Sequence, residues 1–279
     1  MDINKIIQLE NDGITMEADD DYLYVRCKRE MHKYDLSDMK LVVKNTIFKK
    51  DGKARQFAVG DDYIALTDFC DLYILNKDDL SVSGVLKIGV NQSSDLCEVR
   101  CAGNTAYLSI RNGVFATVDL CGQTVHKEKL CTGSTWDMTL AGDFLYAGTT
   151  TGELLEIQKD ELNLFKKAQL CKPNIQGVVF HKGIIYAASR DKALQIIDAD
   201  TFETILTINK VISTTTLLLG IWNDQLISAD WNQVSRWDIN TLQHIESFNY
   251  PTGYYIKGVY LCNGTLYGSD YEYIYQSKL

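Results

Sequence analysis

A short apolar motif, most often containing Tyr, recurs seven times along the chain at a nearly constant interval. One residue of each copy, here called the anchor, is separated from the next anchor by 41, 42, 39, 40, 41 and 40 residues. Self-similarity at a fixed period of about 20–50 residues is typical of repeat architectures, and chance does not produce intervals this uniform. The anchors are Tyr24, Ala65, Tyr107, Tyr146, Tyr186, Ile227 and Tyr267.

Each repeat has the pattern of four short strands joined by polar or Gly-containing turns. In the third repeat we expect strands at 96–102, 105–110, 114–119 and 123–130, and connections of this length suit antiparallel hairpins. The 16 Tyr, 9 Phe and only 2 Pro favour strands over helices. Several strands are apolar at consecutive positions, as at 178–180, which predicts burial on both faces.

Seven four-stranded units, each covered on both faces, predict a single all-β domain in which the units stand side by side as a seven-bladed β-propeller. The seventh repeat lacks a fourth strand, and residues 3–9 have no partner of their own. We therefore expect this N-terminal strand to complete the last blade and close the ring without an unpaired edge. The blades are expected at about 14–48, 54–90, 96–130, 136–170, 175–210, 216–249, and 256–279 with 3–9.

A second landmark is the turn that follows the third strand. It begins with Asp or Asn in five repeats, and such side chains accept hydrogen bonds from N–H groups two or three residues on. The segment VSRWDINTLQHI at 234–245 resembles the end of a WD40 repeat, and the D-x-x-T-[LF] pattern of the fifth and sixth repeats resembles the YVTN and quinoprotein-like propellers. The resemblance implies a propeller fold and, as for WD40-like propellers generally, binding of protein partners.

Composition excludes some classes of function. The net charge of −9 and a pI of about 5.0 argue against nucleic acid as a partner, because such binding relies on clustered Lys and Arg. The N-terminus lacks the pattern of a signal peptide, and no apolar stretch approaches the length of a membrane span. Together with eight Cys, which we expect to be reduced, this predicts a cytoplasmic protein. We also expect the protein to be monomeric on its own.

Propellers present their binding residues on the face that carries two sets of connections: from the fourth strand of one blade to the first strand of the next, and from the second strand to the third. Loops held by a rigid scaffold are common carriers of function. Aromatic and Arg side chains are favoured at protein interfaces. The candidates for partner binding are Arg26, Arg29, Arg55, Phe69, Arg111, Trp136, Arg190, Trp231, Tyr254, Tyr255 and Tyr271.

Catalytic machinery is not indicated by the pattern. The four His do not converge on this face, which argues against a His-ligated metal and against a Ser-His-Asp set. Carboxylates alone could bind Ca²⁺ or Mg²⁺ at the mouth of the channel, with Glu98, Asp137, Asp230 and Asp270 as weak candidates. Pairing of these carboxylates with neighbouring Arg or Lys is the alternative that we favour, and no cofactor is expected.

We therefore expect a non-enzymatic module that presents its loop-rich face to a protein or peptide. One alternative is a propeller hydrolase or lyase that acts on a small or carbohydrate substrate with a divalent cation at the channel mouth. Another is a non-catalytic receptor for a small ligand or glycan, in which Trp136, Trp231 and Tyr255 would provide stacking surfaces.

Overall fold

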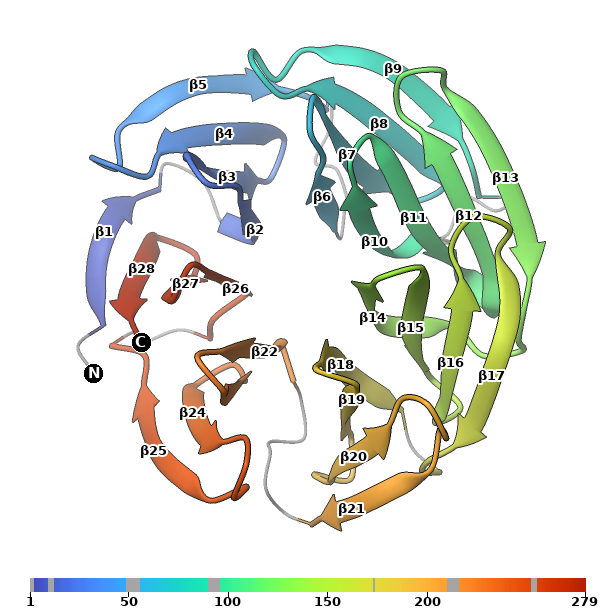
Figure 1. Cartoon of the computed structure of the whole chain (residues 1–279). Coiled ribbons are helices and arrows are strands. Elements are labelled where there is room, and N and C mark those ends of the chain that lie inside the picture. Colours follow the sequence, from blue (N-terminus) through green and yellow to red (C-terminus); the bar gives the residue numbers. More distant parts are fainter. Residues whose placement is uncertain are drawn as a thin grey trace.

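The computed structural model describes residues 3–9, 13–48, 56–89, 96–172, 174–209, 216–251 and 255–279. These residues form 28 strands in seven four-stranded antiparallel sheets. The sheets stand around a common axis, as the ring in Figure 1 shows. The predicted all-β, seven-bladed propeller is thus confirmed.

Within each blade the strands run in order from the axis to the rim. Blade 1 contains β2 (Gly13–Ala18), β3 (Tyr22–Cys27), β4 (Glu30–Asp35) and β5 (Leu41–Thr46). Blade 2 contains β6 (Phe57–Val59), β7 (Tyr63–Asp68), β8 (Asp71–Asn76) and β9 (Val82–Lys87). Blade 3 contains β10 (Leu96–Ala102), β11 (Thr105–Ile110), β12 (Val114–Asp119) and β13 (Thr124–Lys129), with a short 3₁₀ turn at Arg111–Gly113.

The remaining blades repeat this order. Blade 4 contains β14 (Thr135–Ala141), β15 (Phe144–Thr149), β16 (Glu153–Gln158) and β17 (Asn163–Gln169). Blade 5 contains β18 (Ile175–His181), β19 (Ile184–Ser189), β20 (Leu194–Asp198) and β21 (Thr204–Ile208). Blade 6 contains β22 (Leu218–Trp222), β23 (Gln225–Ala229), β24 (Gln233–Asp238) and β25 (His244–Asn249).

Blade 7 combines the two ends of the described chain. Its strands are β26 (Gly258–Cys262), β27 (Thr265–Ser269), β28 (Tyr273–Lys278) and, at the rim, β1 (Asn4–Gln8). β1 pairs antiparallel with β28, and Figure 1 shows the blue and red strands side by side. The predicted closure by the N-terminal strand is confirmed, and it leaves β28 without an open edge.

The apolar core lies between the blades rather than at the centre of the ring. The buried apolar residues form seven clusters in the described part of the chain, and each cluster joins two neighbouring blades. For example, Tyr24 and Phe48 of blade 1 pack with Ile64 and Leu75 of blade 2. This arrangement explains why the strands are apolar at consecutive positions, since both faces of a blade meet a neighbour.

The turns after the third strands confirm the capping role of Asp in blades 5 and 6. The Oδ1 atom of Asp198 accepts hydrogen bonds from the Thr201 N–H at 2.8 Å and the Thr201 hydroxyl at 3.1 Å. Asp238 and Thr241 repeat the arrangement at 2.8 and 3.0 Å. These Asp residues therefore hold turns, which places the D-x-x-T pattern among structural features rather than binding residues.

Candidate binding surfaces: the loop face and the central channel

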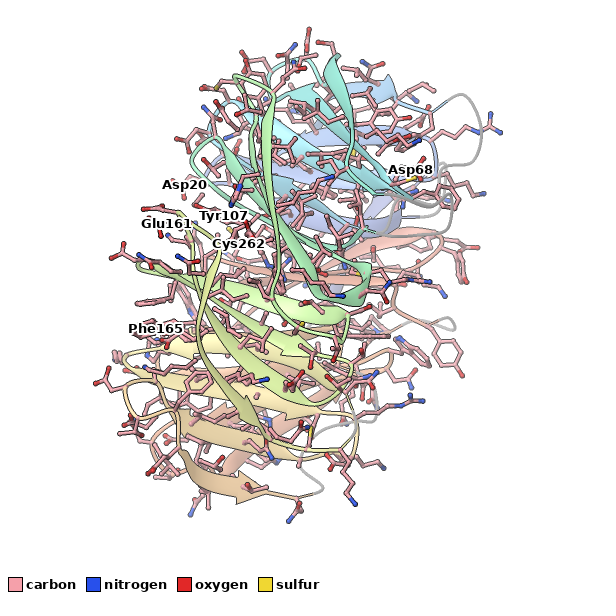
Figure 2. All side chains as sticks on the ribbon, turned by 90° about the vertical axis from the view of Figure 1, so that its right-hand side faces the viewer. Asp20, Asp68, Tyr107, Glu161, Phe165 and Cys262 are labelled. Carbon is pink, nitrogen blue, oxygen red and sulfur yellow. The ribbon has the colours of Figure 1, made fainter. Side chains whose placement is uncertain are left out.

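The two ends of the ring carry different connections. One end carries the turns from the second to the third strands and the connections from rim to axis; we call it the loop face. Figure 2 shows the molecule from the side, with Asp68 of the loop face at one end and Asp20 and Glu161 at the opposite end. The inner strands run between these ends, so a residue near the start of an inner strand lies close to the loop face.

Most of the candidate binding residues are exposed on the loop face. Arg29, Arg111 and Arg190 are exposed. Trp136, Trp231, Tyr255 and Tyr271 expose 47%, 46%, 56% and 41% of their surface. Among the described residues, the other large exposed apolar side chains lie on rim strands, as Phe165 does in Figure 2. Exposed aromatic residues are therefore concentrated at one end of the ring.

Two of these aromatic residues contact one another where blades 6 and 7 meet, and Tyr271 of blade 7 lies against the neighbouring Lys257. We call Trp231, Tyr255 and Tyr271 the aromatic patch. The rings of Trp231 and Tyr255 lie 5.6 Å apart between centroids at an angle of 58°. The Ile256 N–H donates a hydrogen bond of 2.9 Å to the Trp231 carbonyl, which fixes this pair. Two residues further on, Lys257 places its Nζ atom 4.7 Å from the centre of the Tyr271 ring. Trp136 stands apart on blade 4, two blades before Trp231 along the ring.

Two candidates differ from the expectation. Arg26 was expected in a loop, but it lies within β3, fully buried between blades 1 and 2 with its guanidinium 5.9 Å from the Phe48 ring. Burial lowers the pKa of Arg26 to about 10, although the nearby Asp68 carboxylate opposes this change. Phe69 is half-buried in its turn, with a φ of 52°. Arg55 and Tyr254 fall outside the described residues.

A cavity of about 770 Å³ occupies the centre of the ring and is lined mainly by the inner strands. Its two sides differ in chemistry. Blades 1, 3 and 4 contribute Glu17, Glu98, Arg100 and Asp137. Blades 5, 6 and 7 contribute mainly apolar side chains, among them Val179, Leu218, Ile221, Val259 and Leu261. The channel is therefore amphipathic in cross-section.

Arg100 links two carboxylates in the channel. One of its Nη atoms donates to Glu98, and the other donates to Asp137 Oδ1 at 2.7 Å. The second oxygen of Asp137 accepts the Val178 N–H of blade 5 at 2.8 Å. Burial raises the pKa values of both carboxyl groups, that of Glu98 to about 7, while the Arg100 charge opposes the rise. Asp137 therefore joins blades 3, 4 and 5 at the axis.

Glu17 is placed differently, because among the described residues it has no cationic hydrogen-bond partner. Its Oε2 atom accepts only the Val59 N–H of blade 2, at 3.0 Å. Burial raises the pKa of Glu17 to about 8, Arg100 and the Val59 N–H act against the rise, and Glu98 adds to it. The Glu17 side chain is half-buried and lines the cavity, so this carboxyl group faces the channel.

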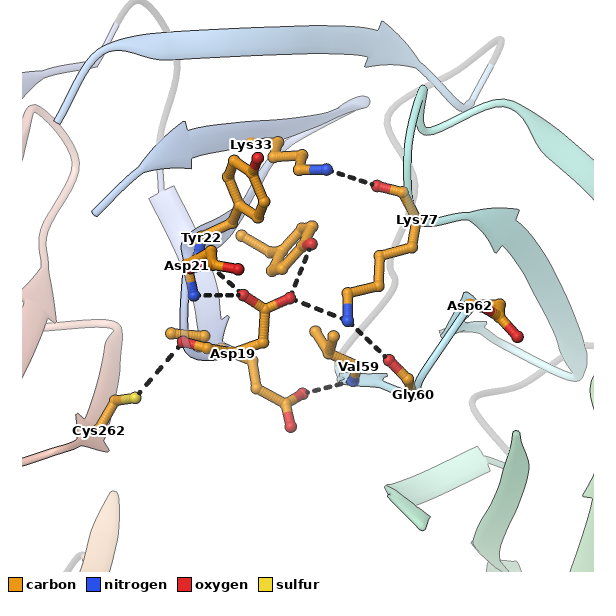
Figure 3. A network of polar contacts seen from close by, with 12 residues as sticks. Asp19, Asp21, Tyr22, Lys33, Val59, Gly60, Asp62, Lys77 and Cys262 are labelled. Atoms are coloured by element: carbon orange, nitrogen blue, oxygen red, sulfur yellow. Dashed lines mark hydrogen bonds and ion pairs between the residues drawn. The ribbon is translucent and has the colours of Figure 1, made fainter. Parts of the chain in front are cut away.

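Asp19, which directly follows the strand that carries Glu17, takes part in a polar network between blades 1 and 2 that Figure 3 shows. Lys77 reaches from blade 2 to Asp19 Oδ2 at 2.9 Å and to the Gly60 carbonyl at 3.1 Å. Asp19 also accepts the Tyr24 hydroxyl and the Tyr22 N–H. Burial acts to raise the pKa of Asp19, but the hydrogen bonds from Lys77 and the backbone outweigh it and lower that pKa.

The four weak metal candidates do not form one site. Asp230 Oδ1 accepts the Asn232 and Gln233 N–H groups, and Asp270 Oδ1 accepts the Glu272 and Tyr273 N–H groups, so both cap turns of the loop face. Glu98 and Asp137 lie in the channel and share Arg100. In the part of the chain that the structure describes, no group of three or more His, Cys, Asp or Glu side chains is arranged to hold a metal ion.

The sequence prediction included neither Glu17 nor Arg100, although a signal for both was present. Glu17 pairs with Tyr24, and Arg100 pairs with Tyr107, so both stand opposite an anchor on an inner strand. A charged residue at this position is unusual in strands that are otherwise apolar. Aligning the inner strands on the anchors would have identified Glu17 and Arg100 as the charged residues at this level of the channel.

Comparisons with known proteins add support for the fold alone. No family model matches the chain, and no curated protein matches it. Solved structures do match, among them the crystal structure of the computationally designed Ika8 protein, with a TM-score of 0.72 over 99% of both chains at 9% sequence identity. At this identity the likeness concerns the fold only. Within the described ranges, no helix is long and apolar enough to cross a membrane.

Proposed function

We propose that this protein is a non-enzymatic binding module that recognises a protein or peptide through its loop face. The partner contacts the aromatic patch of Trp231, Tyr255 and Tyr271. Exposed Arg residues of the same face supply polar contacts around it. Tyr, Trp and Arg are the residue types that contribute most to binding energy at protein interfaces.

The observation that carries this proposal is that, among the described residues, four of the five large aromatic side chains that are exposed lie on the loop face, and only Phe165 lies on the rim. Trp231 and Tyr255 each expose about half of their surface while they contact one another. A pair of this kind forms a rigid apolar surface that costs little side-chain entropy to bury. The rim strands also expose apolar residues, in places at consecutive positions such as Leu41 and Val42, but in the described part of the chain Phe165 is the only aromatic residue among them.

The test compares two pairs of substitutions with equal numbers of exposed apolar side chains. The first is Trp231→Ala with Tyr255→Ala on the loop face, and the second is Phe165→Ala with Ile205→Ala on the rim. All four side chains are exposed, so neither variant should affect folding. A partner captured on the wild-type protein from native extract is purified and titrated against all three forms by calorimetry.

The loop-face variant should weaken binding of the purified partner by about tenfold or more, which corresponds to about 1.4 kcal/mol, and the rim variant should leave it unchanged. A partner that binds the loop-face variant as tightly as the wild type would contradict the proposal. Trp136→Ala then tells whether the contact extends across the mouth of the channel to blade 4.

A further inference from the structure

We propose that the central channel binds a small organic cation with an apolar body, whose charged group pairs with Glu17 and whose body lies against blades 5 to 7. This site is separate from the aromatic patch and does not depend on the function proposed for the loop face. It is assigned from the shape of the cavity, the arrangement of its charges and the unpaired polar atoms on its wall.

The size of the cavity suits an organic molecule. Its volume of about 770 Å³ is within the range of about 300–1,000 Å³ that is usual for small-molecule sites. A bare metal ion would leave most of this space unused. It would also need several oxygen ligands, and no metal-holding group of side chains is found among the described residues.

The charges on the inner strands select for a cation. The inner strands contribute three carboxyl groups and one guanidinium group to the cavity, and Arg100 is shared between Glu98 and Asp137. Arg111, in the turn after β11, adds a second guanidinium group on the loop-face side. Glu17 accepts a hydrogen bond only from the Val59 N–H in the described part of the chain. A carboxylate removed from bulk water is stabilised by an opposite charge within a few ångströms. An ammonium group beside Glu17 would supply that charge.

Unpaired acceptors on the cavity wall point to a ligand with N–H donors. Gln176 and Thr216 line the cavity and are each 94% buried, yet the Gln176 Oε1 and Thr216 Oγ1 atoms have no hydrogen-bond partner among the described residues. Thr135, near the loop face, has an unpaired Oγ1 as well. A buried acceptor left without a donor costs about 1–3 kcal/mol. The unpaired oxygen atoms are covered, so a ligand that donates to one of them removes this cost once the side chain rotates toward the cavity.

The remaining wall matches an apolar body. Val179, Leu218 and Ile221 lie on the side of blades 5 and 6, and Val259 and Leu261 continue the surface on blade 7. Burial of apolar surface contributes about 25 cal/mol for each Å² removed from water. A ligand that is charged at one end and apolar at the other would therefore satisfy both sides of the channel at once.

The experiment uses three probes of the same length that differ in their polar end: 4-phenylbutylamine, 4-phenylbutan-1-ol and 4-phenylbutyrate. Each is titrated into the full-length protein by calorimetry at about pH 9, where Glu17 is ionised and the amine is still mostly protonated. The amine should bind about tenfold or more tightly than the alcohol, and the butyrate should bind most weakly.

Two variants and a control locate the site. Glu17→Gln should lower the affinity for the amine about tenfold and leave the affinity for the alcohol unchanged. Val179→Trp, which fills the apolar side of the cavity, should lower both affinities. Glu203→Gln changes an exposed glutamate on the surface and should change neither. Equal affinities of the amine and the alcohol, an unchanged amine affinity in Glu17→Gln, or no binding of any probe up to low millimolar concentration would each overturn the proposal.

The pH dependence of binding distinguishes pairing with Glu17 from an indirect effect of the substitution. The affinity for the amine should rise between about pH 6 and about pH 9, as Glu98 and then Glu17 lose their protons. In Glu17→Gln only the part of this rise near pH 7, which is due to Glu98, should remain. An identical profile in both proteins would overturn the pairing. The other groups facing Glu17 are the Val59 N–H from β6, Glu98, Arg100 and Cys101 from β10, and Tyr260 and Cys262 from β26.

Discussion

Replacement of Glu17 by Gln should make the folded protein more stable at alkaline pH, although it removes a charged residue that takes part in a hydrogen bond between blades. The Gln side chain retains an oxygen that can accept the Val59 N–H, so the contact with blade 2 survives. What disappears is a carboxyl group that resists ionisation in the folded state. The gain in stability should therefore depend on pH.

The sign and size of the effect follow from the pKa of Glu17, which burial raises from its ordinary 4.5 to about 8. A group with a raised folded pKa stabilises the folded state most below its unfolded pKa, and this contribution is lost as the pH rises toward the folded pKa. The full rise corresponds to about 5 kcal/mol at about 1.36 kcal/mol for each pH unit. Because Glu17 is half-buried and contacts the channel, screening reduces the expected change between about pH 5 and pH 9 to about 2–4 kcal/mol.

The assay is urea denaturation of the wild type and of Glu17→Gln at both pH values. The difference in the free energy of unfolding between the two proteins should grow by about 2–4 kcal/mol in favour of the variant at the higher pH. Glu203→Gln, at an exposed site, should show no such change. If the difference in the free energy of unfolding between the wild type and Glu17→Gln stays constant from pH 5 to pH 9, burial does not raise the pKa of Glu17 in the folded protein.

Three further substitutions or deletions test other parts of the structure by the same denaturation assay. Arg100→Met should lower the free energy of unfolding by about 3–5 kcal/mol at about pH 8, because Glu98 and Asp137 lose their shared partner. Adding Glu98→Gln and Asp137→Asn should restore part of this stability, and no recovery would contradict the pairing. Lys77→Met should lower the free energy of unfolding by about 1–3 kcal/mol, because Asp19 and the Gly60 carbonyl lose a donor. A loss of stability no larger than that caused by Lys129→Met, at an exposed position of β13, would contradict this role. Deletion of residues 1–9 should lower stability and promote aggregation detectable by light scattering, because β28 becomes an open edge; a monomer that unfolds at the wild-type urea concentration would show that the ring does not need β1.

The fold could be predicted from the sequence because its signal is repeated seven times. A single repeat is ambiguous, but the anchors recur at nearly equal spacing, and the same reading of four strands has to fit every interval. In the third repeat the expected strands agree with β10 to β13 to within a residue at each end. The closure of the ring was also predictable, since β28 needed a partner and residues 3–9 were the unassigned strand.

The site was less predictable because the strands are buried on both faces. In a one-sided sheet, alternation of polar and apolar residues shows which side chains point to solvent, but here each blade lies between two others. Arg26 illustrates the difficulty: as a charged residue near the end of an apolar strand it was assigned to the loop, whereas β3 continues to Cys27 and buries it. Charge alone did not distinguish a loop residue from one buried between blades.

The channel therefore contains charged groups of two kinds, and only one of them is explained by the fold. Glu98 and Asp137 share Arg100, and Asp137 also joins blade 5, so these residues contribute to the assembly of the ring. Glu17 makes one hydrogen bond, which Gln could also make, and its ionised form is disfavoured by burial. A residue that lowers stability and can be replaced without loss of contacts is a candidate for a role in function. Glu17→Gln should thus yield a protein that is more stable than the wild type yet binds the organic cation about tenfold more weakly, and a stable variant with unchanged binding would assign no role in ligand binding to this carboxyl group.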